Sequence, residues 1–196
     1  MATLVNSLYP PYMDTFMPAF VYDDEEGARI SFSISPYNDT DSINYIHISL
    51  VDQATNKSVL KTGVLSGGAG VIADGILVLP FSPSTNTSNV YDEDTGLYYV
   101  TIPPTYLKGD GNKAATQYQL NRYYQAQIRF DNTSSLSFSS TAAISSHLLE
   151  HRQNFSEWSN VTLLRPIPRP IFRFNNLDDA GNTEPAKRLN EYNEER

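Results

Sequence analysis

Apolar and polar residues alternate along most of this chain, and the alternation is most regular in Asn121–Phe130. From Tyr124 onward every second residue is apolar, and the residues between are Gln125, Gln127 and Arg129. The apolar set is Tyr124, Ala126, Ile128 and Phe130. A period of two with one polar face is typical of an antiparallel strand. The segment therefore predicts a central strand, with the other strands arranged around it.

Further segments alternate in the same way, and turns rich in Gly, Asn, Asp and Pro separate them. The predicted strands are Arg29–Ser35, Ile43–Val51, Ser58–Lys61, Ile76–Leu79, Leu97–Ile102 and Val161–Leu164. In the second of these, His47 falls on the face opposite Ile46 and Ile48, which predicts a solvent-exposed histidine. No amphipathic helices lie between these strands, so the pattern predicts an antiparallel sandwich or barrel rather than βαβ units.

One segment, Thr141–Gln153, has helical periodicity, with Ser140 or Thr141 placed to cap its N-terminus. It contains His147, Glu150 and His151 in the order H-x-x-E-H, which is the inverted zinc-peptidase motif. Such a pair of histidines could share a zinc ion, with the glutamate as general base. The short helix lies within a β fold and lacks a third ligand on a second helix. The pattern therefore favours a solvent-facing histidine pair, and we predict no metal, cofactor or catalytic site.

Two other segments have simple structural interpretations. Ser7–Phe20 carries three prolines among large apolar residues, which predicts an extended lead-in along a sheet edge. Gly68, Gly70 and Ala73 match the dinucleotide-binding pattern G-x-G-x-x-A, but a predicted strand follows where that motif requires a helix. We therefore expect a flexible glycine loop between edge strands and no bound cofactor.

Composition limits the cellular setting. The 196 residues include no cysteine, which excludes disulfides and thiolate chemistry. Six Asn-x-Ser/Thr patterns occur, at Asn38, Asn56, Asn86, Asn132, Asn154 and Asn160. The N-terminus lacks a basic and then apolar signal segment, and no apolar run approaches the roughly 20 residues of a membrane-spanning helix. The six patterns fit either a glycosylated extracellular protein or asparagines in the turns between strands. Because neither a signal segment nor cysteine is present, we expect turn residues in a protein that does not enter the membrane or the usual secretory route.

The net charge of −8 is unevenly distributed. Residues 1–164 hold 8 Lys/Arg and 16 Asp/Glu, whereas residues 165–196 hold 6 of each. An acidic body repels phosphate backbones, so we expect no nucleic-acid partner. The proline-rich stretch after residue 164 carries evenly spaced arginines, and it fits either a stiff spacer or a basic arm that docks on an acidic neighbour. Its predicted assembly contacts are Arg165, Arg169, Phe172 and Arg173.

Two regions together resemble the F–G region of fibronectin type III domains. These are the Tyr-x-Ala-x-Ile-x-Phe strand at 124–130 and the segment Phe155-Ser-Glu-Trp158-Ser159, followed by a closing strand. The resemblance covers about a third of the chain and implies an all-β, antiparallel immunoglobulin/fibronectin type III-like β-sandwich. Residues 131–154 depart from it, because that family has a short loop there. We expect the sandwich at 1–166, with a helical insertion at about 140–153, and an extended arm and polar tail at 167–196.

The absence of cysteine and of a signal segment, the Asn/Ser/Thr/Tyr-rich strands and the proline-rich connector are similar to fibronectin-type modules in tail proteins of tailed bacteriophages. This resemblance implies a non-enzymatic virion component, assembled in the host cytoplasm, that contacts other virion proteins and copies of itself. A host cell-surface glycan is the alternative partner, for a carbohydrate-binding or adhesion module. Five tyrosines are the candidate platform for sugar rings: Tyr91, Tyr98, Tyr99, Tyr123 and Tyr124. A zinc hydrolase is the third hypothesis.

Overall fold

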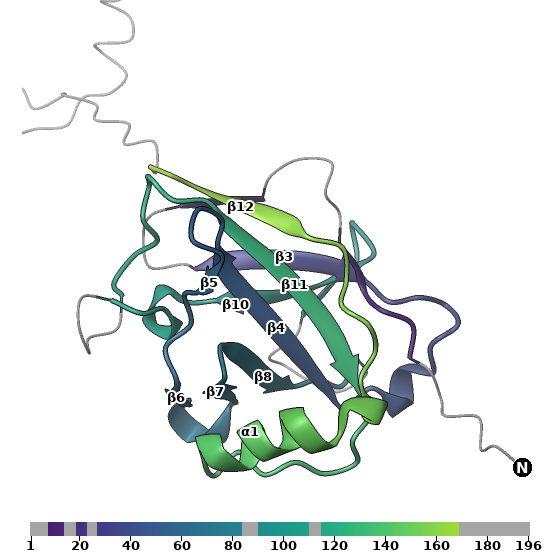
Figure 1. Ribbon diagram of the computed structural model, residues 1–196. Helices are drawn as coiled ribbons and strands as arrows, with labels where there is room; N and C mark the ends of the chain where they lie inside the picture. The colour runs from purple at the N-terminus through teal and green to yellow at the C-terminus, as the bar shows by residue number, and fades with distance from the viewer. Residues whose placement is uncertain (1–7, 14–18, 23–26, 84–89, 110–114, 169–196) are drawn as a thin grey trace, which may run out of the picture.

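The computed structural model describes residues 8–13, 19–22, 27–83, 90–109 and 115–168. These residues form two β-sheets and one α-helix (Figure 1). The smaller sheet has the strand order β1-β3-β10-β9, and all its pairs are antiparallel. Its strands are β1 (Tyr12–Met13), β3 (Ala28–Ser33), β10 (Leu97–Ile102) and β9 (Val90–Asp92).

The larger sheet has the order β2-β12-β11-β4-β8-β7-β6, with β5 paired to β4. Its strands are β2 (Ala19–Tyr22), β12 (Thr162–Ile167), β11 (Tyr124–Asp131), β4 (Tyr45–Asp52), β8 (Ile76–Pro80), β7 (Val71–Ala73), β6 (Gly63–Val64) and β5 (Lys57–Ser58). Only β2 and β12 pair in parallel. Four short 3₁₀ turns join these strands, at Thr40–Ser42, Ser66–Gly68, Pro104–Tyr106 and Arg152–Asn154.

The main core lies between the two sheets. Ile30, Phe32 and Ile102 from the smaller sheet pack in one cluster with Ile48 and Phe130 from the larger sheet. Every second residue of β11, from Tyr124 to Phe130, is buried, as the alternation predicts. The prediction of an all-β, mostly antiparallel fold with two stacked layers is therefore confirmed.

The seven predicted strands exist with shifted boundaries, and the described residues form five further strands, β1, β2, β6, β7 and β9. The glycine-rich segment is not a simple loop, because residues 71–73 form β7, which joins β8 through a two-residue turn at Asp74 and Gly75. Both turn residues have positive φ, 50° and 76°, as a type I′ hairpin turn requires. The last strand runs to Ile167 rather than ending before Pro166, because β2 pairs with its edge.

The predicted helix is α1 (Thr141–Glu150), and the side chain of Ser140 accepts a hydrogen bond from the Ala143 amide as its N-cap. It covers the outer face of the larger sheet, at the bottom of Figure 1. Ile144 and Leu148 pack there with Val71, Ala73 and Val78 in a second, smaller core. This sheet is therefore buried on both faces where α1 lies, which single-faced alternation did not predict.

Two asparagine side chains hold the start of the described chain against the sandwich. Asn160 accepts a hydrogen bond from the Met13 amide at 2.8 Å and donates one to the Met13 carbonyl at 2.6 Å. Asn38 makes the same pair of bonds with the backbone of Tyr9, at 2.7 and 2.9 Å. Each carboxamide thus pairs with the backbone as a neighbouring strand would. The predicted extended lead-in along a sheet edge is confirmed for Tyr12 and Met13, which pair with β3 as an edge strand.

Replacing Asn160 with alanine is expected to release β1 locally, because both polar groups of Met13 lose their partner. Amide hydrogen exchange of Met13 should accelerate, and the free energy of unfolding should fall by about 1–2 kcal/mol. Asn38→Ala is the matched control, since it removes the equivalent pair of bonds at Tyr9 and should leave exchange at Met13 unchanged. Equal exchange rates at Met13 in the Asn160→Ala variant and the unmodified protein would contradict this clamp.

Within the described residues, no helix combines the length and the hydropathy needed to cross a lipid bilayer.

Candidate functional site

Three buried titratable residues from β4, β11 and α1 meet at one point beneath the helix. His47 from β4 and His147 from α1 both direct Nε2 at the same oxygen of Asp131, at the end of β11. The distances to Asp131 Oδ2 are 3.0 Å for His47 and 2.6 Å for His147. The other carboxylate oxygen accepts the backbone N–H of Thr133 at 2.8 Å. His47 and Asp131 are fully buried, and His147 nearly so. We call these three residues the His–Asp–His cluster.

The protonation of His47 follows from its neighbour Arg129. Arg129 Nε lies 3.0 Å from His47 Nδ1, and an arginine N–H can only donate. His47 Nδ1 is therefore the acceptor, so the neutral ring carries its proton on Nε2 and donates it to Asp131. Burial lowers the pKa of His47 below its usual 6.5, which agrees with a neutral ring.

Asp131 is the negative charge of the cluster. Burial alone would raise its pKa, but the hydrogen bonds from His47 and Thr133 outweigh that effect and hold the pKa at about 2. An ionised carboxylate can only accept hydrogen bonds, so His147 must also donate through Nε2. Each polar atom of the Asp131 side chain is thus paired with a donor.

The three residues also offer one metal-ligand atom each, and these atoms lie within 4.8 Å of one another. A metal-binding histidine normally donates its second ring nitrogen to an acceptor. His47 does the reverse, because Arg129 donates to Nδ1 and thereby keeps the proton on Nε2, the nitrogen that would face the ion. Arg129 also places a positive charge beside the cluster. This donor set fits a hydrogen-bonded cluster rather than a metal centre.

Two predictions about the histidines are wrong. His47 was expected on an exposed face and is fully buried, because α1 and Phe155 cover that face of the sheet. His147 was expected to face solvent with His151, but it points into the cluster, while Glu150 and His151 are exposed. The rings of His147 and His151 stack at 5.2 Å, yet His147 Nε2 is bound to Asp131. The H-x-x-E-H pattern therefore does not form a zinc-peptidase site.

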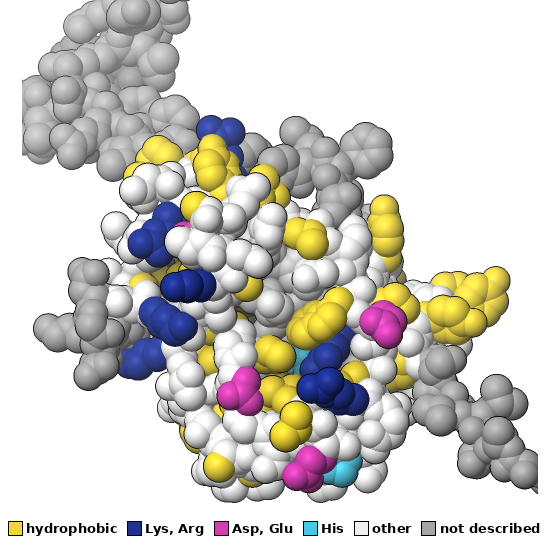
Figure 2. Space-filling model, in the orientation of Figure 1, with side chains coloured by type: hydrophobic (Ala, Val, Ile, Leu, Met, Phe, Trp, Pro, Cys, Tyr) yellow, Lys and Arg dark blue, Asp and Glu magenta, His cyan; other side chains and the backbone are white. Residues whose placement is uncertain are grey.

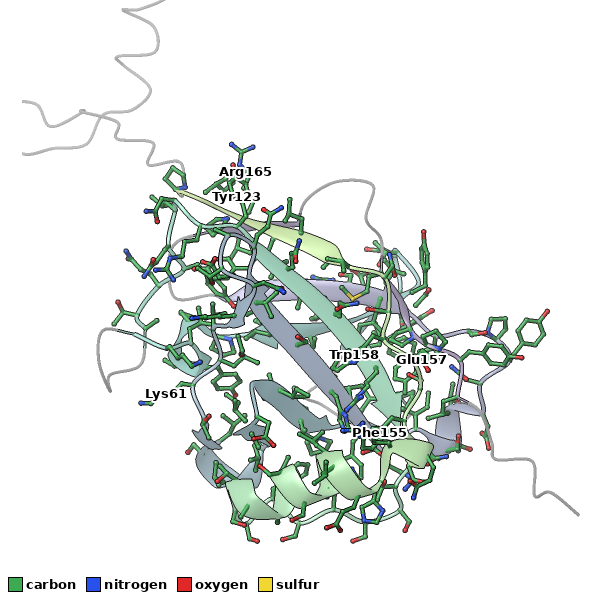
Figure 3. All side chains as sticks on the ribbon, viewed as in Figure 1. Lys61, Tyr123, Phe155, Glu157, Trp158 and Arg165 are labelled. Carbon is green, nitrogen blue, oxygen red and sulfur yellow. The ribbon has the colours of Figure 1, made fainter. Side chains whose placement is uncertain are left out.

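Above the cluster, Arg129 forms the floor of an open groove. Its guanidinium carbon lies 4.3 Å from the ring centre of Phe155 and 4.5 Å from that of Trp158. These distances are within the range of cation–π interactions. Burial lowers the pKa of Arg129 to about 10, so it remains positively charged at neutral pH. Figure 3 shows Phe155, Glu157 and Trp158 together near the end of β11, above α1.

The groove has a volume of about 550 Å³ and lies between α1 and the segment 155–158, with the β7–β8 turn beside it. The sequence singled out 155–159 only through its resemblance to a family turn and did not connect it to Arg129. Alternation placed Arg129 correctly on the outer face of β11. Arg129 and segment 155–159 come together only because β11 pairs with the segment that follows α1, and this long-range pairing cannot be seen in the sequence.

The five candidate tyrosines do not form one platform. Tyr124 is buried in the main core, and Tyr98 packs against Phe32 and Phe81. Tyr91, Tyr98 and Tyr99 lie on the smaller sheet, whereas Tyr123 directly precedes β11 of the larger sheet. The predicted carbohydrate platform on these residues is not assembled.

Of the predicted assembly contacts, only Arg165 can be placed. It is exposed on β12, and its guanidinium carbon lies 5.9 Å from the ring centre of Tyr123 (Figure 3). Arg169, Phe172 and Arg173 lie outside the described residues, so their role stays a prediction.

Comparison with models of protein families, with curated proteins and with solved structures finds no match to this chain.

Proposed function

We propose that this protein is a non-enzymatic structural module that acts through protein–protein contacts in a multi-copy assembly. The observation that carries the proposal is a set of three exposed tyrosines, two in contact with each other and the third in the same asparagine-held N-terminal segment. Tyr9, Tyr12 and Tyr37 are 51%, 64% and 80% exposed, and the rings of Tyr9 and Tyr37 lie 5.8 Å apart. We call these three residues the tyrosine surface.

The tyrosine surface is pre-organised. The Asn38 carboxamide fixes the backbone of Tyr9 beside the turn that carries Tyr37, and Asn160 fixes the residue that follows Tyr12. Tyrosine is enriched in the energetic centres of protein interfaces, because it buries a large area with few rotatable bonds. Holding the backbone in place before binding reduces the entropy lost on association.

The charge distribution favours contacts between copies. Although the net charge is −8, one depression of about 140 Å³ is lined by Lys57, Lys108 and Arg122 and by a single carboxylate, Asp52, which pairs with Arg122 at 3.7 Å. Dark-blue side chains gather on this flank in Figure 2, and Lys61 lies on the same side in Figure 3. A basic flank on an acidic body provides complementary surfaces for neighbouring copies or for other acidic proteins.

A virion of a tailed bacteriophage is the assembly that best fits the sequence pattern, with the sandwich as a fibronectin type III-like module assembled in the host cytoplasm. The two-layer antiparallel fold supports this assignment without distinguishing it from other sandwich families. The partners would be other virion proteins and further copies of this chain, contacted through the tyrosine surface and the arm that begins near Arg165.

Mass spectrometry and electron microscopy of intact particles test the proposal. The chain should be present in a fixed copy number per particle, with the tyrosine surface covered by a neighbour. The double variant Tyr12→Ser, Tyr37→Ser should fold with an unchanged melting temperature and be incorporated at least about tenfold less, as expected when interface anchors are lost. Tyr91→Ser, an exposed tyrosine on the opposite edge strand β9, is the matched control. Absence of the chain from purified particles, or normal incorporation of the double variant, would contradict the proposal.

A further inference from the structure

The groove above Arg129 combines an aromatic wall with polar groups of both charges. Trp158 and Phe155 form one side, and Leu148, Leu149 and Arg152 form the other. In Figure 2, yellow and dark-blue side chains meet at the centre of the visible face, above α1, with magenta side chains to either side. Its volume of about 550 Å³ lies within the range of sites that bind small molecules.

The groove contains hydrogen-bond donors that have no partner among the described residues. Arg129 uses Nε for His47, and its terminal N–H groups make no hydrogen bond with any described residue. The stacking contacts with Phe155 and Trp158 fix the plane of this guanidinium. Arg152 is exposed and its side chain likewise makes no hydrogen bond within the described part of the chain. The donors are therefore positioned before any ligand binds.

Acceptors lie in the same groove. The carboxylates of Asp74, in the β7–β8 turn, and Glu157 line it, and neither makes a hydrogen bond or ion pair within the described residues. The two arginines and two carboxylates balance in charge, and the buried carboxylate of Asp131 lies behind Arg129. A strongly anionic ligand would meet these acidic groups, and a cation would meet the arginines. The lining therefore suits a neutral ligand that both donates and accepts hydrogen bonds.

We propose that this groove binds a neutral saccharide. A sugar ring has an apolar face of C–H groups that can pack on the exposed part of the Trp158 indole, and hydroxyl groups around its rim. Those hydroxyls would accept hydrogen bonds from Arg129 and Arg152 and donate them to Asp74 and Glu157. The site is separate from the tyrosine surface and goes beyond the protein contacts proposed above. A particle component that carried it would contact a glycan as well as its protein neighbours.

The experiment uses the fluorescence of Trp158, which is the only tryptophan of the chain and lies in the groove itself. The probes are glucose, galactose, mannose, N-acetylglucosamine and N-acetylgalactosamine, together with their di- and trisaccharides. At least one should shift or quench the emission saturably, with a dissociation constant of about 0.1–10 mM, as expected for a shallow groove that holds one or two rings. No saturable change with any of these sugars up to about 50 mM, well above that range, would overturn the proposal.

Variants separate a sugar site from a general effect on the fold. Arg152→Gln and Glu157→Gln alter exposed side chains that make no hydrogen bond to any residue the structure describes, so both should keep the melting temperature and weaken binding about three- to tenfold. Glu93→Gln, in the exposed β9–β10 turn, is the matched control for Glu157→Gln and should bind as the unmodified protein does. The same fluorescence titration is repeated with glucuronate and with inorganic phosphate at constant ionic strength. A response to these anions without a response to neutral sugars would also overturn the proposal and indicate an anion site.

Discussion

Replacing Asp131 with alanine is expected to lower the free energy of unfolding by about 3–5 kcal/mol, as is typical when one partner of a buried polar network is removed. The substitution leaves the Nε2–H groups of two buried imidazoles and the backbone N–H of Thr133 without their acceptor. Water cannot replace the carboxylate readily, since His47 and Asp131 are fully buried. Urea unfolding followed by Trp158 fluorescence measures the loss.

Two controls test whether the loss of stability comes from the hydrogen bonds of the cluster. Glu93→Ala removes an exposed carboxylate in the β9–β10 turn and should change stability by less than about 0.5 kcal/mol. A chelator such as EDTA should leave the melting temperature of the unmodified protein unchanged, because the cluster is held by hydrogen bonds. A large decrease of the melting temperature with EDTA, or an Asp131→Ala variant as stable as the unmodified protein, would show that this description of the cluster is wrong.

The cluster connects the core to the surface through Arg129. Asp131 fixes His47, the Nδ1 of His47 fixes Arg129, and Arg129 supports the aromatic residues of the groove. A guanidinium that is held at Nε and stacked on two rings keeps its terminal N–H groups in one orientation. The buried polar residues therefore serve binding at the groove by positioning Arg129, and they are not accessible to a substrate themselves.

The longer strands and the helix could be predicted from the sequence because their residue patterns are local. Alternation over eight to ten residues defined β4, β10 and β11, and a serine cap with helical periodicity defined α1. Isolated two- or three-residue strands such as β1 and β7 carry no such signal. Their pairing depends on contacts between segments distant in the sequence, for example the bonds from Asn160 to Met13.

The site could not be predicted for the same reason. His47 is predicted to be exposed if one face of the sheet is open to solvent. It is buried because α1 packs on that face. The register of β4 and β11 pairs Arg129 with His47, but alternation within one strand does not reveal the register between two. The H-x-x-E-H pattern drew attention to the correct helix and to His147. It suggested the wrong partners, because His147 pairs with an aspartate 16 residues earlier in the chain.

The cluster should also make the stability depend on pH, and two of its residues act in the same direction. The pKa of His47 is lowered by burial, so below pH 6.5 the unfolded chain binds a proton that the folded chain does not. The pKa of Asp131 is about 2 in the folded protein and near 3.8 when unfolded, so it too favours the unfolded chain as the pH falls from 3.8 towards 2. Stability from both groups is complete above pH 6.5 and is lost on acidification.

We therefore expect the free energy of unfolding to decrease below pH 6.5, with a contribution from His47 that approaches about 1.4 kcal/mol per pH unit. Urea unfolding between pH 8 and pH 4.5 measures the slope. His47→Gln should flatten it, because the residue that titrates only in the unfolded chain is gone, whereas His151→Gln alters an exposed histidine outside the cluster and should retain most of it. If His47→Gln is too unstable to compare, the imidazole resonances of His47 provide a second test, because in the folded protein this ring should titrate with a midpoint below pH 6.5. Titration of this ring near pH 6.5 in the folded protein would mean that His47 is not held neutral by burial and by the hydrogen bond from Arg129.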